Sequence, residues 1–141
     1  MKRSEAYALR AQMETTFEKA TPNMTGDEVI QSRVLCKVWK PGKHSPGEVY
    51  TVNGQPWSCY QAYDNAVYPD IVPGSAAWPT FNKPYHGTTP ETALPFVRPT
   101  HSQDIYKKGE YMIWTDGTLQ LCVRDTAYSP EHDPNAWEGQ A

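Results

Sequence analysis

The sequence predicts a mainly β protein with an N-terminal helical hairpin, an α+β arrangement in which two small β-hairpin modules pack together. Three observations predict this class. The 141 residues include 13 prolines and 9 glycines, too many for a helical bundle. The 5 Trp, 9 Tyr and 3 Phe, with a net charge of only −3, supply enough apolar surface for a core and argue against disorder. Finally, one short hairpin pattern occurs twice.

The first element is an expected amphipathic helix over residues 4–20, which contain neither Pro nor Gly. Ser4 is its expected N-cap, and Pro22 ends it. The apolar residues recur at steps of three and four and share one stripe, namely Ala6, Leu9, Met13, Phe17 and Ala20. We expect this stripe to pack on the β region or on a partner subunit.

A second short helix is expected to start at Gly26 or Asp27 and to run toward Ser32 or Leu35. Thr25 and Glu28 have the spacing of a capping box, in which each side chain bonds the other residue's backbone N–H. The two helices would form a hairpin over residues 1–37, and residues 1–35 could join copies of the chain into a homo-oligomer.

The β region contains an internal repeat. The segment 47–59 returns as 109–122, offset by 62 residues at the first glycine and by 63 at the cysteine. In both copies a tight-turn dipeptide, Asn53-Gly54 or Asp116-Gly117, stands between two runs rich in β-branched and aromatic residues. This pattern is a strong signal for a β-hairpin.

Each copy ends on a small residue and Trp after a proline, at Ala77-Trp78 and Ala136-Trp137. We therefore expect a first module over 38–80, a Pro-rich linker over 81–99 and a second, diverged module over 100–141. Core positions are expected for the tryptophans at the module boundaries, which are Trp39, Trp78 and Trp137.

Charge and cysteine content exclude several function classes. The 13 Lys and Arg form no basic run longer than two residues, so neither nucleic acid nor insertion into a membrane is expected. The sequence starts with charged residues instead of an apolar signal stretch, so we expect synthesis in the cytoplasm. The three cysteines lack metal-site spacing and are expected to be free, mostly buried thiols: Cys36, Cys59 and Cys122.

An enzymatic function is not expected either. None of the familiar catalytic motifs is present. The four histidines lie in Pro-rich loops without ligand spacing, so we expect no metal and no cofactor; they are His44, His86, His101 and His132. Glu48 and Glu110 hold matching repeat positions, where we expect them to secure the start of each hairpin.

The first module contains, in order, Trp39, Gly47-Glu48-Val49-Tyr50, Asn53-Gly54, Trp57 and the segment from Pro73 to Trp78. In this order of residues it resembles the carbohydrate-binding modules of the chitinase type (chitin-binding type 3, families 5 and 12). The complete layout also resembles phage and prophage tail-region proteins. That likeness rests on the linker 87–93, on Asp104-x-Tyr106-x-x-Gly109-Glu110, and on Tyr128-Ser129-Pro130 followed by Trp137-Glu138.

The resemblance implies a ligand surface of exposed aromatics just after the second hairpin strand. Counted from Trp57, the two platform positions fall at Gln61 and Ala62, and in the second copy at Arg124 and Asp125, none of which is aromatic. The first module is therefore the expected binding module. Its candidate carbohydrate-binding residues are Trp57, the rings of Tyr60, Tyr63 and Tyr68, and the hydrogen-bonding groups of Gln61, Asp64 and Asn65. A core position for Trp57 and loop packing for the tyrosines remain alternatives.

Two functions follow as expectations. The first is a non-catalytic, chitin-binding-like accessory protein, made in the host cytoplasm and carried on a phage tail or particle, that contacts a host-surface glycan. The second is a structural virion or tail-assembly protein that uses the module to pack against other virion proteins. The tyrosines at residues 60–68 favour the first, and the missing aromatic pair favours the second.

Overall fold

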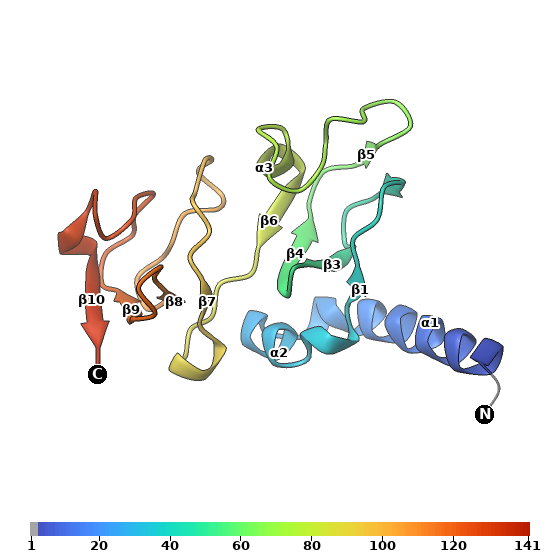
Figure 1. Ribbon diagram of the computed structural model, residues 1–141, viewed down its shortest axis with the longest axis horizontal. Coiled ribbons are helices and arrows are strands. Elements are labelled where there is room, and N and C mark those ends of the chain that lie inside the picture. The colour runs from blue at the N-terminus through green and yellow to red at the C-terminus, as the bar shows by residue number, and fades with distance from the viewer. Residues whose placement is uncertain (1–2) are drawn as a thin grey trace.

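The computed structural model describes residues 3–141 and consists of an N-terminal helical part followed by two four-stranded sheets (Figure 1). The predicted mainly β, α+β fold class is confirmed. The helical segments are α1 (Arg3–Ala20), η1 (Thr21–Asn23), α2 (Gly26–Gln31), η2 (Arg33–Leu35), α3 (Trp78–Phe81), η3 (Pro90–Thr92) and η4 (Pro134–Ala136). The strands are β1 (Lys37–Val38), β2 (Lys43–His44), β3 (Val49–Val52), β4 (Gln55–Cys59), β5 (Tyr63–Asp64), β6 (Asn82–Pro84), β7 (Leu94–Pro95), β8 (Tyr111–Ile113), β9 (Leu119–Cys122) and β10 (Trp137–Gln140).

The two predicted helices are both present, with one correction. Because α1 already includes Arg3, Ser4 lies inside the helix and is not its N-cap. The helix ends at Ala20, where η1 carries Pro22. At α2 the predicted capping box is confirmed: the Thr25 hydroxyl accepts from the Glu28 backbone N at 3.2 Å, and the Glu28 carboxylate accepts from the Thr25 N at 2.9 Å.

The expected packing of the α1 stripe is confirmed only at its C-terminal end. Phe17 is buried against Val29, Cys36 and Val49, where the helices meet one face of the first sheet. Leu9 and Met13 stay 45% and 43% exposed. In Figure 1 the helices lie beneath the first sheet, and the second sheet lies on the side away from the start of α1.

The two four-stranded sheets share one topology. The first sheet has the strand order β1-β3-β4-β6, and the second runs β7-β8-β9-β10. In each sheet the first pair is parallel and the other two pairs are antiparallel. The first module adds the two-stranded sheet β2-β5, whose counterpart in the second is the single bridge between Tyr106 and Thr126.

Backbone hydrogen bonds match between the copies. Gly47 N donates to Cys59 O at 3.1 Å, and Gly109 N donates to Cys122 O at 2.8 Å. Both glycines have φ +96°, which L side chains rarely adopt. The closing tryptophans are not equivalent, in contrast to the expectation, because Trp137 pairs with Cys122 in the sheet. The residue that pairs with Cys59 is Asn82, and Trp78 lies one helical turn earlier, in α3.

The segment expected to be a linker contributes to both sheets. Residues 82–84 form β6 at the edge of the first sheet, and residues 94–95 form β7 at the edge of the second. Between them Gly87 is buried, and its O accepts from Tyr111 N at 2.8 Å. A Cβ at Gly87 would lie 2.1 Å from Thr92 O, so the chain passes too close for any side chain.

The core is divided into three clusters. The first centres on Tyr50, Cys59, Tyr63, Ile71 and Trp78, with half-buried Trp39 and Trp57 against it. The second centres on Tyr106, Met112, Cys122, Ala136 and Trp137. The third joins the helices to the first sheet. All three cysteines are buried and free, as predicted, and Trp39, Trp78 and Trp137 pack in the core or against it, also as predicted.

Candidate functional site

The segment that follows β4 holds most of the predicted site residues. Its three tyrosines differ in how far they are exposed to solvent. Tyr63 is only 5% exposed. Its Oη accepts a hydrogen bond from Trp39 Nε1 at 2.9 Å and lies 2.8 Å from Tyr50 Oη. Burial raises the pKa of Tyr63. The prediction of Tyr63 as a ligand-stacking ring is therefore wrong, because β5 pairs with β2 and turns this side chain into the first core cluster.

Tyr60 connects the two modules. Its ring is half-buried, and its hydroxyl donates to the Pro79 carbonyl and accepts from Gln103 Nε2. Burial raises the pKa of Tyr60. Since both of its hydrogen bonds are made within the protein, the hydroxyl already has partners, and only part of the ring faces solvent.

Tyr68 is the member of the three that faces solvent. It is 61% exposed and follows the equally exposed Val67. Its backbone N donates to Asp64 O at 2.8 Å, so the ring stands on a closed turn. A hollow of about 350 Å³ lies beside it, lined by Val67, Tyr68, Pro69, Asp70, Ile71, Ala77 and Phe81.

Asn65 and Asp64 hold this turn in place. The Asn65 side chain accepts from Gly42 N at 3.1 Å and donates to Ile71 O at 2.8 Å, and the Asp64 carboxylate accepts from Ala66 N at 2.9 Å. Asn65 was predicted to bond ligand hydroxyls, but its amide group bonds backbone groups of Gly42, which precedes β2, and of Ile71 in the loop. The consequence is a fixed loop that presents Tyr68.

The expected platform positions carry no ring in the structure either. Gln61 and Ala62 are exposed just after β4. Trp57, the other candidate, is half-buried and packs edge-on against Trp78 at 5.5 Å between ring centroids. In the second module Arg124 is exposed and forms an ion pair with Asp133.

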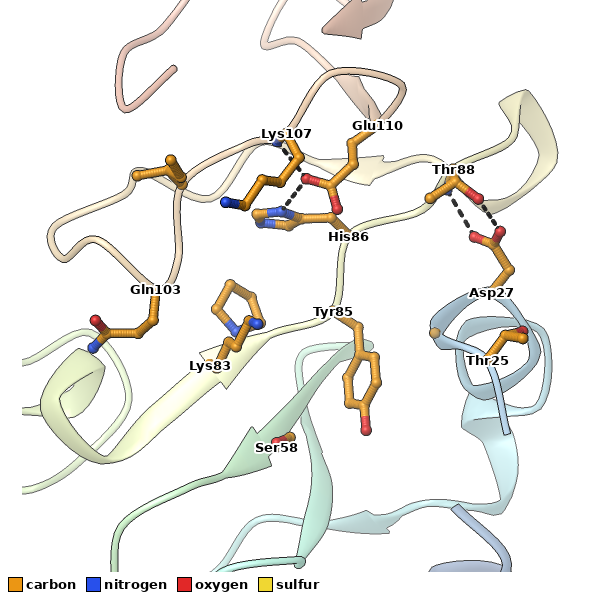
Figure 2. A pocket seen from close by; sticks show the side chains of 13 residues that line it. Thr25, Asp27, Ser58, Lys83, Tyr85, His86, Thr88, Gln103, Lys107 and Glu110 are labelled. Carbon is orange, nitrogen blue, oxygen red and sulfur yellow. Dashed lines mark hydrogen bonds and ion pairs between the residues drawn. The ribbon is translucent and has the colours of Figure 1, made fainter. Parts of the chain in front are cut away.

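A second candidate site, which sequence reasoning missed, is a cavity of about 520 Å³ where three parts of the chain meet (Figure 2). The start of α2, the first module and the second module all contribute to its wall. The lining residues are Thr25, Gly26, Asp27, Ser58, Lys83, Pro84, Tyr85, His86, Thr88, Gln103, Ile105, Lys107 and Glu110.

His86 and Glu110 form a buried pair in this wall. His86 Nδ1 lies 3.2 Å from Glu110 Oε1, and the side chains are 7% and 18% exposed. The imidazole stacks flat on Tyr106, with ring centroids 3.8 Å apart. Lys107 N also donates to Glu110 at 2.6 Å. His86 Nε2 is buried and has no hydrogen-bond partner within residues 3–141.

Asp27, at the start of α2, also lines the cavity. Its carboxylate accepts from Thr88 N at 2.7 Å and from Thr92 Oγ1 at 2.8 Å, and it also accepts from the Thr88 hydroxyl. Burial alone would raise the pKa of Asp27, but these hydrogen bonds outweigh it and hold the pKa below its ordinary value. Asp27 is therefore a fixed anion that ties α2 to the segment between the sheets.

Comparison with models of known protein families and with curated proteins found no match to this chain. Across the described residues, 3–141, no group of three or more His, Cys, Asp or Glu is placed to hold a metal ion. In the same residues no helix is both long enough and apolar enough to span a membrane.

Proposed function

We propose that the chain is a non-catalytic glycan-binding protein and that Tyr68 is its principal contact. The observation that carries this proposal is the exposed Tyr68 ring beside an apolar hollow on a loop fixed by hydrogen bonds. On the strength of the sequence resemblance, we extend the proposal to a phage tail or particle protein that contacts a chitin-like or other host-surface glycan.

Recognition would depend on stacking. A flat Tyr ring can cover the apolar face of a pyranose, while the nearby Asp64 and Asp70 offer hydrogen-bonding groups to its hydroxyls. Stacking of a base on an aromatic ring, a related contact, contributes about 1–3 kcal/mol per ring. One ring therefore gives weak binding, and useful affinity would come from many copies acting together.

The test is a titration of chitin oligomers and soluble host cell-wall fragments into the full chain, followed by backbone amide chemical shifts. We expect shifts in residues 64–72 that vanish in Tyr68→Ala. The matched control is Tyr128→Ala, because Tyr128 is equally exposed, at 62%, but lies in the second module. The proposal fails if no glycan produces a response, or if both variants lose it equally.

A second candidate is the structural alternative, in which α1 assembles copies of the chain or binds other virion proteins. The observation in its favour is the exposed part of the α1 stripe, where Leu9 and Met13 line a hollow of about 450 Å³ with Phe17 and Leu35. Exposed apolar patches often mark interaction sites.

Light scattering after size exclusion tests this candidate. We expect the full chain to elute as an oligomer, and the double variant Leu9→Ser and Met13→Ser to elute as a monomer. Ala8→Ser, on the same helix but outside the hollow, should leave the oligomer intact. A full chain that is monomeric at high concentration argues against self-assembly through α1.

A further inference from the structure

We propose that the cavity between the modules binds an acidic sugar, a hydroxylated carboxylate of the hexuronic acid type. This site is separate from the Tyr68 loop and goes beyond the glycan contact proposed there. It rests on three features of the wall: an unpartnered buried imidazole nitrogen, two lysines without ion pairs, and two carboxylates that already have their donors.

The imidazole nitrogen without a hydrogen-bond partner favours a ligand that carries a hydroxyl. Because a carboxylate accepts hydrogen bonds, the hydrogen between His86 Nδ1 and Glu110 lies on Nδ1, and Nε2 is the nitrogen without a partner. A buried polar atom without a partner is costly, so such atoms are rare in native proteins. A ligand hydroxyl that donates to Nε2 would satisfy it.

The first module contains a similar His–Glu pair in which both imidazole nitrogens have hydrogen-bond partners. There His44 Nδ1 lies 3.2 Å from Glu48 Oε1, just as His86 lies from Glu110, but His44 Nε2 also lies 2.8 Å from the Lys40 carbonyl. Both nitrogens of His44 thus have acceptors inside the protein. Of the two pairs, only His86–Glu110 leaves an imidazole nitrogen without a hydrogen-bond partner among residues 3–141, and His86 lines the cavity.

The two lysines of the cavity wall favour an anionic ligand. Lys83 and Lys107 both line the cavity, and neither forms an ion pair within residues 3–141. Figure 2 shows them on either side of the His86 ring. The wall carboxylates form no ion pair with them: Asp27 accepts hydrogen bonds from Thr88 and Thr92, and Glu110 contacts His86 and accepts from Lys107 N. A ligand carboxylate could therefore sit between the two ammonium groups.

The size and construction of the cavity also fit a sugar. About 520 Å³ lies within the range of small-molecule sites. Its walls are held before any ligand arrives, by the close passage at Gly87, by the Asp27–Thr88 hydrogen bonds and by the stacking of His86 on Tyr106. A ligand would meet prepositioned groups and would lose little free energy to ordering them.

The test is a titration of sodium D-glucuronate into the full chain, followed by chemical shifts and by calorimetry. Two controls are titrated in the same way: D-glucose, a sugar without a carboxylate, and sodium acetate, a carboxylate without a sugar ring. We expect saturable shifts around His86 with glucuronate, and much weaker responses to the other two. Lys83→Gln and Lys107→Gln should each weaken binding by up to about fivefold, the upper end of the range for one exposed charge contact.

His86→Phe keeps a ring to stack on Tyr106 and removes the nitrogens, so it should weaken binding about tenfold. Lys108→Gln is the matched control, because Lys108 is exposed beside Lys107 but does not line the cavity. If His86→Phe does not fold, the two lysine variants still test the proposal.

The proposal is overturned if glucuronate gives no saturable response, if glucose or acetate binds equally well, or if Lys108→Gln weakens binding as much as Lys107→Gln. Tyr68→Ala should leave glucuronate binding unchanged, so the two proposals can fail separately.

Discussion

Glu48 and Glu110 hold the same position in the two modules, and each performs the local role expected from the sequence. The Glu48 carboxylate accepts from Ser45 N, and the Glu110 carboxylate accepts from Lys107 N, which closes the turn before each hairpin. Each also contacts a histidine, but His44 belongs to its own module and His86 comes from the segment between the sheets. The turn was predictable from sequence spacing. The second histidine was not, because no local pattern reports a contact across 24 residues.

The exposure of the three tyrosines shows a similar limit to what the sequence can predict. Sequence reasoning placed Tyr60, Tyr63 and Tyr68 in or near one loop, and that is where they lie. Which ring faces solvent depends on the pairing of β5 with β2 and on the hydrogen bonds of Asn65. A loop has no hydrophobic period from which such a direction could be read.

Gly87 allows a residue-scale prediction. Gly87→Ala should lower the free energy of unfolding by about 2 kcal/mol or more, because its Cβ would lie 2.1 Å from Thr92 O and the backbone would have to move. Urea denaturation measures the change. Gly42→Ala is the control, since nothing lies within 4 Å of its Cβ, and it should have little effect. Equal effects at both positions would contradict the close passage.

The buried thiols give a prediction on pH. Burial, with smaller contributions from nearby carboxylates, raises the pKa of Cys36 and of Cys122 from 9.0 to about 11. Between pH 9 and pH 11 the unfolded chain therefore loses thiol protons that the folded chain keeps, so stability should fall as pH rises through this window. At pH 8 both thiols should resist a disulfide reagent until urea unfolds the protein.

Urea titrations at pH 8 and pH 10 measure the expected loss, and Cys36→Ala with Cys122→Ala should reduce it. Tyrosines with raised pKa values, among them Tyr50 and Tyr106, add to the loss in the same direction, so the remaining slope should be smaller but not zero. Rapid reaction of the native thiols at pH 8 would be inconsistent with their burial.

At the scale of the element, local signals were predicted best. The capping box of α2 depends on two residues three apart, and the structure has it in full. The hairpins around Asn53-Gly54 and Asp116-Gly117 form as expected, as β3-β4 and β8-β9. The edge strands β1, β6 and β7 were missed because two or three residues are too few to show a hydrophobic period. In addition, Pro84 and Pro95 are typical of a linker. Proline is tolerated there, since an edge strand has N–H groups that need no partner.

The α2 cap can be tested directly. Thr25→Ala should lower the free energy of unfolding by about 1 kcal/mol, because the Glu28 backbone N–H loses its side-chain acceptor. The comparison is Thr15→Ala in the middle of α1, where alanine is the better helix former and no loss is expected. Both are measured by urea denaturation. A Thr25 variant as stable as the Thr15 variant would show that the cap adds nothing.

At the scale of the whole molecule, the three core clusters decide how the chain unfolds. The first and second modules have separate apolar clusters, and polar contacts join them, such as those of Gln103 with Tyr60 and of His101 with Thr80. The repeat in the sequence predicted two like modules. Their docking was not predictable, because it rests on single polar side chains in loops.

We therefore expect the modules to lose structure separately. Met112 is fully buried in the second cluster, so Met112→Ala should destabilise that module by about 2–5 kcal/mol. Hydrogen exchange should then speed up in β8, β9 and β10 while β3 and β4 keep their protection. If amides in both sheets lose protection together, the two modules form one cooperative unit instead.

Because each module completes its own four-stranded sheet, neither copy depends on the other's strands for its backbone hydrogen bonds. The first module has a long loop with an outward tyrosine, whereas the second, with a single bridge in place of β2-β5, contributes Glu110 and Lys107 to a wall that neither module could build alone. The junction thus carries a shared surface that a single module does not have.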